Sequence, residues 1–433
     1  MDTKSDFRTI PPAVTDIINV ALPPLRTYRL PNGITMHVYD RSNADVSYLS
    51  IVMPRGQAEA GSPAVSALSS ILQREGSASL SGTGISEILD SNGAWLNSSP
   101  SSHHTRHSLY TLNSRLEKVL PTFTDMVFHP TYPEDAVRLR GEALARNIEV
   151  CQNDTSYLAA CVSDRQIMGV RHPLASVDTP DSIRAITPAQ LAGFQATQCD
   201  CPRTHIYLTG RITSRIERLV ADTFGSITDT SPAAPFNITP FSPASPGRME
   251  IARLDSAMQD SVSLTLPAPD RTHPEYIPLH LTVMALGGYF GSRLMTGIRE
   301  EKGLTYGIRA SLLGYADGAH VSITADTDCR STRQLIDEVR TELTRMSAEP
   351  PRGDELTRLR RAATAMMANR FDSPLSITDY HISALTSAIP DGYFAEKLRL
   401  ISVLTPDMIA DTAATYLRPE LLRTAIAGHP ADM

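Results

Sequence analysis

The sequence carries one order of landmarks twice, and this repeat restricts the possible folds more than any other feature. An arginine-rich helical step, a Thr-Pro step that begins a helix, and a strand that ends in glycine each recur 218 to 220 residues later. Three landmarks in the same order at nearly equal offset indicate the tandem duplication of one domain. The pairs are Val137-Arg138-Leu139-Arg140 with Thr357-Arg358-Leu359-Arg360, Ile186-Thr187-Pro188 with Leu404-Thr405-Pro406, and Gly210 with Gly428.

Within the first copy, strand patterns and helix patterns are mixed. A Pro31-Asn32-Gly33 turn separates two predicted strands between residues 27 and 39. Ser62 followed by Pro63 predicts the start of a helix. We expect strands at 46–54 and 203–210, a strand-rich segment at 94–112, and helices at 63–74, 84–92, 116–128, 133–149, 157–168 and 188–196. This mixture predicts an α+β fold, in which each copy is a mainly antiparallel sheet covered by helices.

Composition divides the chain into four parts. Residues 1–24 are rich in proline and polar residues and predict an extended arm. Residues 25–225 form the first predicted domain and residues 248–433 the second. Between them, residues 226–247 carry five prolines and little periodicity, which is typical of a linker.

Charge and hydropathy exclude two classes of partner. The chain has 40 Lys and Arg against 47 Asp and Glu, with no basic stretch, so we expect no nucleic acid. No apolar run reaches the ~18 residues of a membrane span, so we expect no membrane. The first residues lack the apolar core of a secretion signal, which favours a cytoplasmic protein, or a periplasmic one if a leader was removed.

The segment 286–307 concentrates the features that bear on function. Phe290, Leu294 and Ile298 recur at four-residue spacing and predict one apolar face of a helix. Gly303 predicts a left-handed turn after that helix. The alternation of residues 304–308 predicts a strand that contains Tyr306.

This arrangement would place the Arg299 guanidinium and the Tyr306 phenol near one spot. Both groups donate hydrogen bonds and could bind a carbonyl or an oxyanion. The same residues also fit a structural role, in which Arg299 caps the carboxyl end of the helix and Tyr306 is a half-buried strand aromatic. Local chemistry alone leaves both interpretations open.

Residues 299–306, REEKGLTY, resemble the C-terminal signature of the pitrilysin/insulinase (M16) group of zinc peptidases. That signature has a Gly-Gly turn, a helix that ends in Arg-Glu-x-x-Gly-Leu-x-Tyr, and a strand. The resemblance extends from about residue 25 to residue 428 and implies two related domains that face each other. It implies that Arg299 and Tyr306 hold the substrate at the zinc site. Less specifically, the strand at Trp95 and Asn97 resembles the family's edge strand, which pairs with an extended peptide.

The zinc motif of active family members is missing. Those members carry H-x-x-E-H on the first long helix and a further glutamate about 75 residues later. Aligned on Gly76-Ser77, the corresponding residues are Ala67, Ser70, Ile71 and, in the later helix, Asn147. Alanine and isoleucine offer no lone pair to a metal, and serine is a poor base near neutral pH. We therefore expect no metal in this chain and no zinc chemistry by this chain alone.

Other catalytic or metal sites have less support. His103 and His107 would share one face of a strand and His104 the other, but no acidic residue lies near them in sequence. We interpret them as polar residues on a solvated strand face. Cys199 and Cys201 are too close for a C-x-x-C site and fit inert thiols. The chain also lacks the G-x-S-x-G sequence of serine hydrolases.

Some family members work as pairs of unlike chains, in which one chain holds the zinc and the other supplies the Arg/Tyr pair. The resemblance implies that this chain is the second kind: the non-catalytic, substrate-binding subunit of a two-chain zinc metallopeptidase, with zinc in an H-x-x-E-H partner. The alternative is a proteolytically inactive scaffold or peptide-binding protein with the same fold. Self-association of this chain is the alternative to a heterodimer. A third possibility is a stand-alone enzyme with another mechanism, but no group of residues in the sequence supports one.

Overall fold

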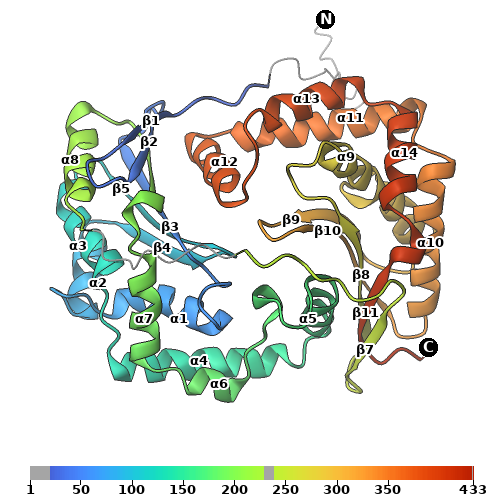
Figure 1. Ribbon diagram of the computed structural model, residues 1–433, viewed down its shortest axis with the longest axis horizontal. Helices are drawn as coiled ribbons and strands as arrows, with labels where there is room; N and C mark the ends of the chain where they lie inside the picture. Colours follow the sequence, from blue (N-terminus) through green and yellow to red (C-terminus); the bar gives the residue numbers. More distant parts are fainter. Residues whose placement is uncertain (1–19, 229–237, 432) are drawn as a thin grey trace, which may run out of the picture.

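The computed structural model describes residues 20–228, 238–431 and 433. The predicted arm at 1–24 and the centre of the predicted linker lie largely outside these residues. The described chain forms two sheets, each with its own helices, which Figure 1 shows side by side. None of the described helices combines the length and the apolar character that a bilayer-spanning helix requires.

The two sheets share the order of five strands, and the first sheet has β1 as a sixth strand at one edge. In the first sheet the order is β1-β2-β6-β3-β5-β4, with β1 Arg26–Arg29, β2 Thr35–Tyr39, β3 Val46–Pro54, β4 Trp95–Pro100, β5 His104–Leu112 and β6 His205–Gly210. In the second it is β7-β11-β8-β10-β9, with β7 Met249–Arg253, β8 Gln259–Ala268, β9 Ile308–Gly314, β10 Ala319–Asp328 and β11 Arg423–Gly428. Only the β2–β6 and β7–β11 pairs are parallel. The predicted α+β fold with two mainly antiparallel sheets is therefore confirmed.

The six helices predicted in the first half are present at nearly the predicted ranges, and α6 and α8 were not predicted. The helices of this half are α1 Pro63–Leu72, α2 Gly82–Ser91, α3 Leu116–Phe128, α4 Glu134–Cys151, α5 Thr155–Met168, α6 Pro180–Arg184, α7 Pro188–Gln198 and α8 Ser214–Gly225. Ser62 caps α1 by accepting a hydrogen bond from the Val65 amide, as the Ser-Pro step predicts. A capping box of Thr187 and Gln190 starts α7.

The second half repeats this set of helices. Its elements are α9 Tyr276–Gly287, a π-helix at Met295–Glu301, α10 Thr332–Ala348, α11 Gly353–Ala368, α12 Pro374–Thr386, α13 Tyr393–Val403 and α14 Pro406–Tyr416. Each half also has its own main apolar core between its sheet and its helices. Because each copy buries a core of its own, the duplication that the sequence indicates is also present in the structure.

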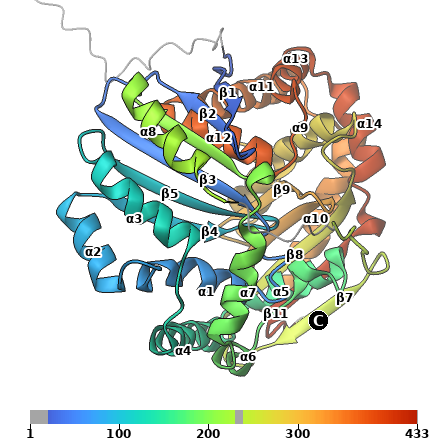
Figure 2. The same cartoon turned by 60° about the vertical axis from the view of Figure 1, so that its left-hand side comes forward.

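One helix from each half packs on the sheet of the other half. Helix α5 belongs to the first copy, yet Ser163 hydrogen-bonds to Ser263 on β8 at 3.0 Å. Helix α12 belongs to the second copy, yet Ile382 packs against Val52 and Tyr207 of the first sheet. Figures 1 and 2 show α5 beside β8 and β11. The domain boundaries at 225 and 248 remain a prediction, and this exchange shows that the two halves do not pack as separate bodies.

Candidate functional site

The segment that carries the Arg/Tyr signature differs from the predicted helix and strand. Helix α9 ends at Gly287, a turn follows, and residues 295–301 form a π-helix. Leu294 and Ile298 are fully buried, as predicted, but Phe290 lies in the turn with 66% of its surface exposed. The prediction that Phe290 shares their helix face was wrong, because the glycine pair ends α9 and the helix begins again only after residue 290. Gly303 does take the predicted left-handed conformation, with φ at 63°.

Tyr306 does not belong to a strand. Strand β9 begins two residues later, at Ile308, and the Tyr306 side chain is 91% exposed. Two side chains hold the backbone just before it: the Thr305 hydroxyl donates to the Asp326 carbonyl at 2.6 Å, and the Thr327 hydroxyl donates to the Leu304 carbonyl at 2.7 Å. The predicted half-buried strand position was therefore wrong, and the phenol projects from an anchored loop.

The structure brings Arg299 and Tyr306 together. Arg299 Nε donates to the Tyr306 carbonyl oxygen at 2.9 Å. The guanidinium carbon lies 5.2 Å from the centre of the Phe290 ring, within the range of a cation–π contact. Glu300 approaches Arg299 Nη1 only to 3.7 Å, so Nη2 stays available for another acceptor. The arrangement places a cation and a phenol at one solvent-facing spot.

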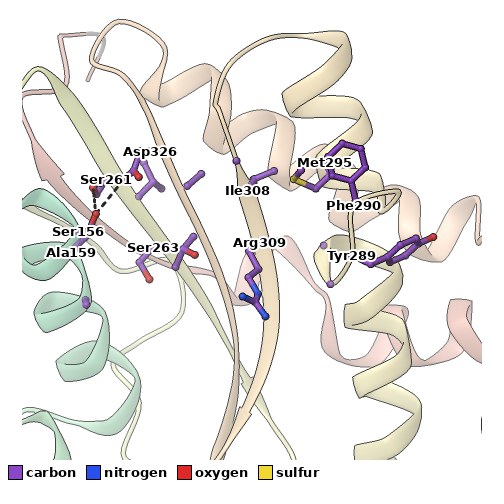
Figure 3. A pocket seen from close by; sticks show the side chains of 17 residues that line it. Ser156, Ala159, Ser261, Ser263, Tyr289, Phe290, Met295, Ile308, Arg309 and Asp326 are labelled. Atoms are coloured by element: carbon purple, nitrogen blue, oxygen red, sulfur yellow. Dashed lines mark hydrogen bonds between the residues drawn. The ribbon is translucent and has the colours of Figure 1, made fainter. Parts of the chain in front are cut away.

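Two neighbouring cavities adjoin this spot. An open cavity of about 700 Å³ contains Arg299 and Tyr306 and is lined entirely by second-half residues. A more apolar cavity of about 590 Å³ lies between β8, β9, β10 and α5, and Asp326 lines both. Figure 3 shows Phe290, Met295 and Ile308 along one side of the second cavity. It can accept an apolar side chain next to a hydrogen-bonding site.

The opposite wall of the apolar cavity is polar and comes from both halves. Ser261 donates to Asp326 Oδ1 at 2.6 Å, and Ser156 of α5 hydrogen-bonds to Ser261 at 3.1 Å. Figure 3 shows these three side chains grouped together. Sequence reasoning missed this wall, because nothing local to α5 predicts that it packs on the second sheet.

The four positions that correspond to the zinc motif hold no ligand set. Ser70 is buried and donates to the Ser66 carbonyl at 3.0 Å within α1. Ile71 is 45% exposed, and Asn147 is exposed on α4. Together with Ala67, these side chains include no imidazole and no carboxylate. Across the described residues, no three His, Cys, Asp or Glu side chains are grouped so that they could hold a metal.

His103 and His107 are buried and His104 is partly buried, so the prediction of a solvated strand face was wrong. His103 Nδ1 lies 2.6 Å from Glu59 and Nε2 lies 2.5 Å from Asp317 of the second half. Burial opposes its charge, but hydrogen bonds to Asp317 and Glu59 outweigh burial and raise the pKa of His103 to about 9. Burial lowers the pKa of His104 to about 4 and that of His107 to about 3. These residues form a structural contact rather than a metal site.

Two further sets of candidate residues lie elsewhere. Trp95 and Asn97 are exposed on β4, which is the edge strand of the first sheet, and neither lines the Arg/Tyr cavity. Cys199 and Cys201 are buried, and their thiols approach the backbone carbonyls of Gln195 and Ile227. The edge position leaves one side of β4 unpaired within its sheet, as peptide addition requires.

Comparisons with known proteins find similar sequences and a shared fold. Residues 185–363 match the family model described as the peptidase M16 inactive domain. The chain is 27% identical over 252 residues to an "uncharacterized zinc protease" of Mycobacterium leprae, which covers 56% of this chain and 55% of that protein. The chain thus spans little more than half the length of that relative.

Two solved structures share the fold over nearly the whole chain. The peptidase M16 inactive domain of Pseudomonas fluorescens has a TM-score of 0.84 and 22% identity, and the match covers 94% of this chain and 98% of that one. A protease from Helicobacter pylori has a TM-score of 0.83 and 17% identity, with 94% and 100% covered. The chain therefore has the fold of these M16-type structures, and its residues 185–363 match the M16 inactive-domain model.

Proposed function

We propose that this chain is the non-catalytic, substrate-binding subunit of a two-chain M16-type zinc metallopeptidase. In this proposal a partner chain with H-x-x-E-H holds the zinc and the attacking water, and forms a heterodimer with this chain. Arg299 and Tyr306 reach the partner's zinc site and bind the carbonyl of the peptide bond that is cleaved. The partner, the zinc and the peptide substrate are all parts of the proposal.

The exposed Arg299–Tyr306 pair carries this proposal. Among the described residues, no side chain accepts a hydrogen bond from the Tyr306 hydroxyl, and 91% of Tyr306 faces solvent. The loop is nevertheless held in place by Thr305 and Thr327. An anchored loop that presents the Tyr306 hydroxyl beside the Arg299 guanidinium is suited to an oxyanion that forms on another molecule.

The surroundings of the pair suit a peptide. The adjoining cavity of about 590 Å³ offers an apolar wall that can take a substrate side chain. On the first sheet, β4 presents an open edge with Trp95 77% exposed. An extended peptide that pairs with an edge strand gains main-chain hydrogen bonds whatever its sequence. Peptide binding by this chain therefore needs no catalytic group of its own.

The test begins with purification of the tagged protein from its native host and identification of stoichiometric partners. A chain of similar size with H-x-x-E-H supports the proposal only if the reconstituted pair hydrolyses peptides and neither chain does so alone. If the pair forms but this chain adds nothing to the partner's hydrolysis, the substrate-binding role is excluded and the scaffold alternative holds. Recovery of this chain alone, as a self-associated assembly, likewise excludes the heterodimer.

A further inference from the structure

A second polar cavity lies in the second half, away from the Arg/Tyr loop. It has a volume of about 200 Å³ and is enclosed by α9, α12, α13, the end of α11 and β9. The cavity is smaller than the ~300–1,000 Å³ typical of sites for drug-sized ligands. Its size therefore suits a small ion rather than a peptide.

The charged groups that line this cavity are all basic. Arg271, Arg370 and Lys397 supply three cationic side chains, and His280 adds an imidazole. None of its lining residues is Asp or Glu. Like charges repel, and a cation withdrawn from water is costly without a counter-charge. The partly buried Arg271 and Lys397 beside the exposed Arg370 are therefore unfavourable when nothing neutralises them.

Several of these groups have unused hydrogen-bonding capacity. Arg271 donates through Nη1 to the Ser387 carbonyl and through Nη2 to the Gly314 carbonyl, but its buried Nε has no partner among the described residues. The buried Nδ1 of His280 likewise has no partner there. Buried polar atoms in folded proteins are nearly always satisfied by protein, water or a bound ion.

The protonation equilibria reflect the missing counter-charge. Burial, with a further contribution from Arg370, lowers the pKa of Lys397 to about 7. Burial also lowers the pKa of His280 well below its usual range, and Lys397 and Arg370 act in the same direction. An anion in the cavity would reverse these effects by favouring the charged form of Lys397.

Neutral donors complete the lining. Burial raises the pKa of Tyr276, Tyr380 and Tyr393, so the three phenols stay protonated and can donate hydrogen bonds. Ser383 contributes a hydroxyl from α12. Cations combined with neutral donors and free of carboxylates match the needs of an oxyanion.

We propose that this cavity binds a small oxyanion with two negative charges, for which inorganic phosphate is the probe. The ion would lie between α9, α12 and α13 and neutralise Lys397, Arg370 and Arg271. A dianion fits better than a singly charged carboxylate, because three cationic side chains converge on the site. This inference does not depend on the proposed peptidase role.

The test is thermal unfolding of the full chain in phosphate and in chloride at equal ionic strength. We expect phosphate to raise the unfolding temperature in a saturable way, and acetate to have a much smaller effect. Calorimetric titration near pH 7.5 in two buffers of different ionisation enthalpy should show proton uptake on phosphate binding, because Lys397 becomes protonated.

Two variants and one control make the test specific. Lys397→Met should raise the unfolding temperature in chloride, because it removes an uncompensated buried charge, and should weaken phosphate binding at least tenfold. Arg370→Gln alters an exposed side chain, so the fold is kept, and should weaken binding as well. Lys118→Gln, at an exposed position on α3, should behave like the wild type.

The proposal is overturned if the phosphate effect does not saturate, or if Lys397→Met and Arg370→Gln keep it unchanged. Either result would show only a general effect of the salt. A stabilising Lys397→Met variant with an unchanged phosphate response would mean that the charge is unfavourable but that the cavity holds no anion.

Discussion

The position of Tyr306 depends on its neighbours rather than on its own side chain. The hydroxyls of Thr305 and Thr327 fix the loop, and Arg299 donates to the Tyr306 backbone carbonyl. The phenol hydroxyl takes no part in these bonds. Removing that hydroxyl alone should therefore leave the loop in place, which makes Tyr306→Phe a clean test of its chemical role.

In the assembled complex, Tyr306→Phe should lower kcat by ~10²–10³, the usual effect of losing one oxyanion donor. The heterodimer should persist at the same concentration, as measured by analytical ultracentrifugation alongside peptide hydrolysis. Tyr416→Phe, on helix α14 at the outer side of the second half, is the matched control and should leave kcat unchanged. An unaltered kcat for Tyr306→Phe would exclude the proposed role.

His103 predicts a pH dependence of stability. Its pKa is raised to about 9 in the folded chain, above the usual value of 6.5, by Asp317 and Glu59 against the effect of burial. Its stabilisation is therefore complete below pH 6.5 and is lost as the pH rises to about 9. The size is up to about 3 kcal/mol. Urea unfolding of the wild type and of His103→Gln should differ most near pH 6 and least near pH 9.5.

The comparison with His103→Gln is needed because Lys397 acts in the opposite direction. Its pKa is lowered to about 7, so its unfavourable effect on stability diminishes as the pH rises above that value. The difference between the two proteins cancels this contribution. A difference that stays constant from pH 6 to pH 9.5 would contradict the assigned ion pairs.

Residue patterns predicted contacts within an element and failed for partners distant in sequence. The Ser62 cap and the left-handed Gly303 follow from local backbone requirements. His103 and Asp317 lie 214 residues apart, and no periodicity links them. The Arg299–Tyr306 pairing was predicted, yet Phe290 was placed on the apolar face of a helix, because a four-residue spacing does not reveal that the helix stops at the glycine pair before it.

At the scale of elements, the exchange of α5 and α12 is the feature that joins the two halves. Thr378 of α12 hydrogen-bonds to Thr209 of β6 at 2.5 Å, and Asp379 pairs with Arg106 of β5. Sequence periodicity predicted α5 as a helix but not its partner sheet, because an amphipathic helix fits either of two homologous sheets. Which of the two sheets α5 packs on depends on how the folded chain connects α5 to its neighbouring elements.

Ile382→Ala should test how strongly α12 couples the halves. Ile382 is 3% exposed and packs against Val52 and Tyr207 of the first sheet. Its truncation should cost about 2–4 kcal/mol in the free energy of unfolding. Because the contact spans both halves, we expect one cooperative transition at lower urea concentration, followed by circular dichroism and by fluorescence of Trp95 in the first half.

The control for this variant is Val403→Ala at the end of α13, where 46% of the side chain is exposed. It should cost less than about 1 kcal/mol. If Ile382→Ala instead splits the unfolding into two transitions, α12 is the main coupling between the halves. A loss as small as that of the control would show that α12 packs only loosely on the first sheet.

For the molecule as a whole, the repeated landmarks predicted two copies of one fold, and the matching strand orders confirm it. Matching copies also leave matching edges, with β4 open in the first sheet and β9 in the second. The copies differ in the residues at their sites: α1 of the first copy carries Ala67, Ser70 and Ile71 in place of a zinc motif, whereas the second copy carries the Arg/Tyr loop after the π-helix. This asymmetry is the reason why we propose that another chain would hold the zinc.

Metal removal tests that assignment directly. The described residues contain no group of three His, Cys, Asp or Glu side chains suited to a metal. A chelator should therefore leave the unfolding temperature of the isolated chain unchanged, while it abolishes peptide hydrolysis by the assembled pair, and added Zn²⁺ should restore hydrolysis. Metal analysis should find one zinc per heterodimer and none in this chain. A fall in the unfolding temperature of the isolated chain on chelation would mean that this chain binds a metal. The proposal that only the partner chain binds the zinc would then be wrong.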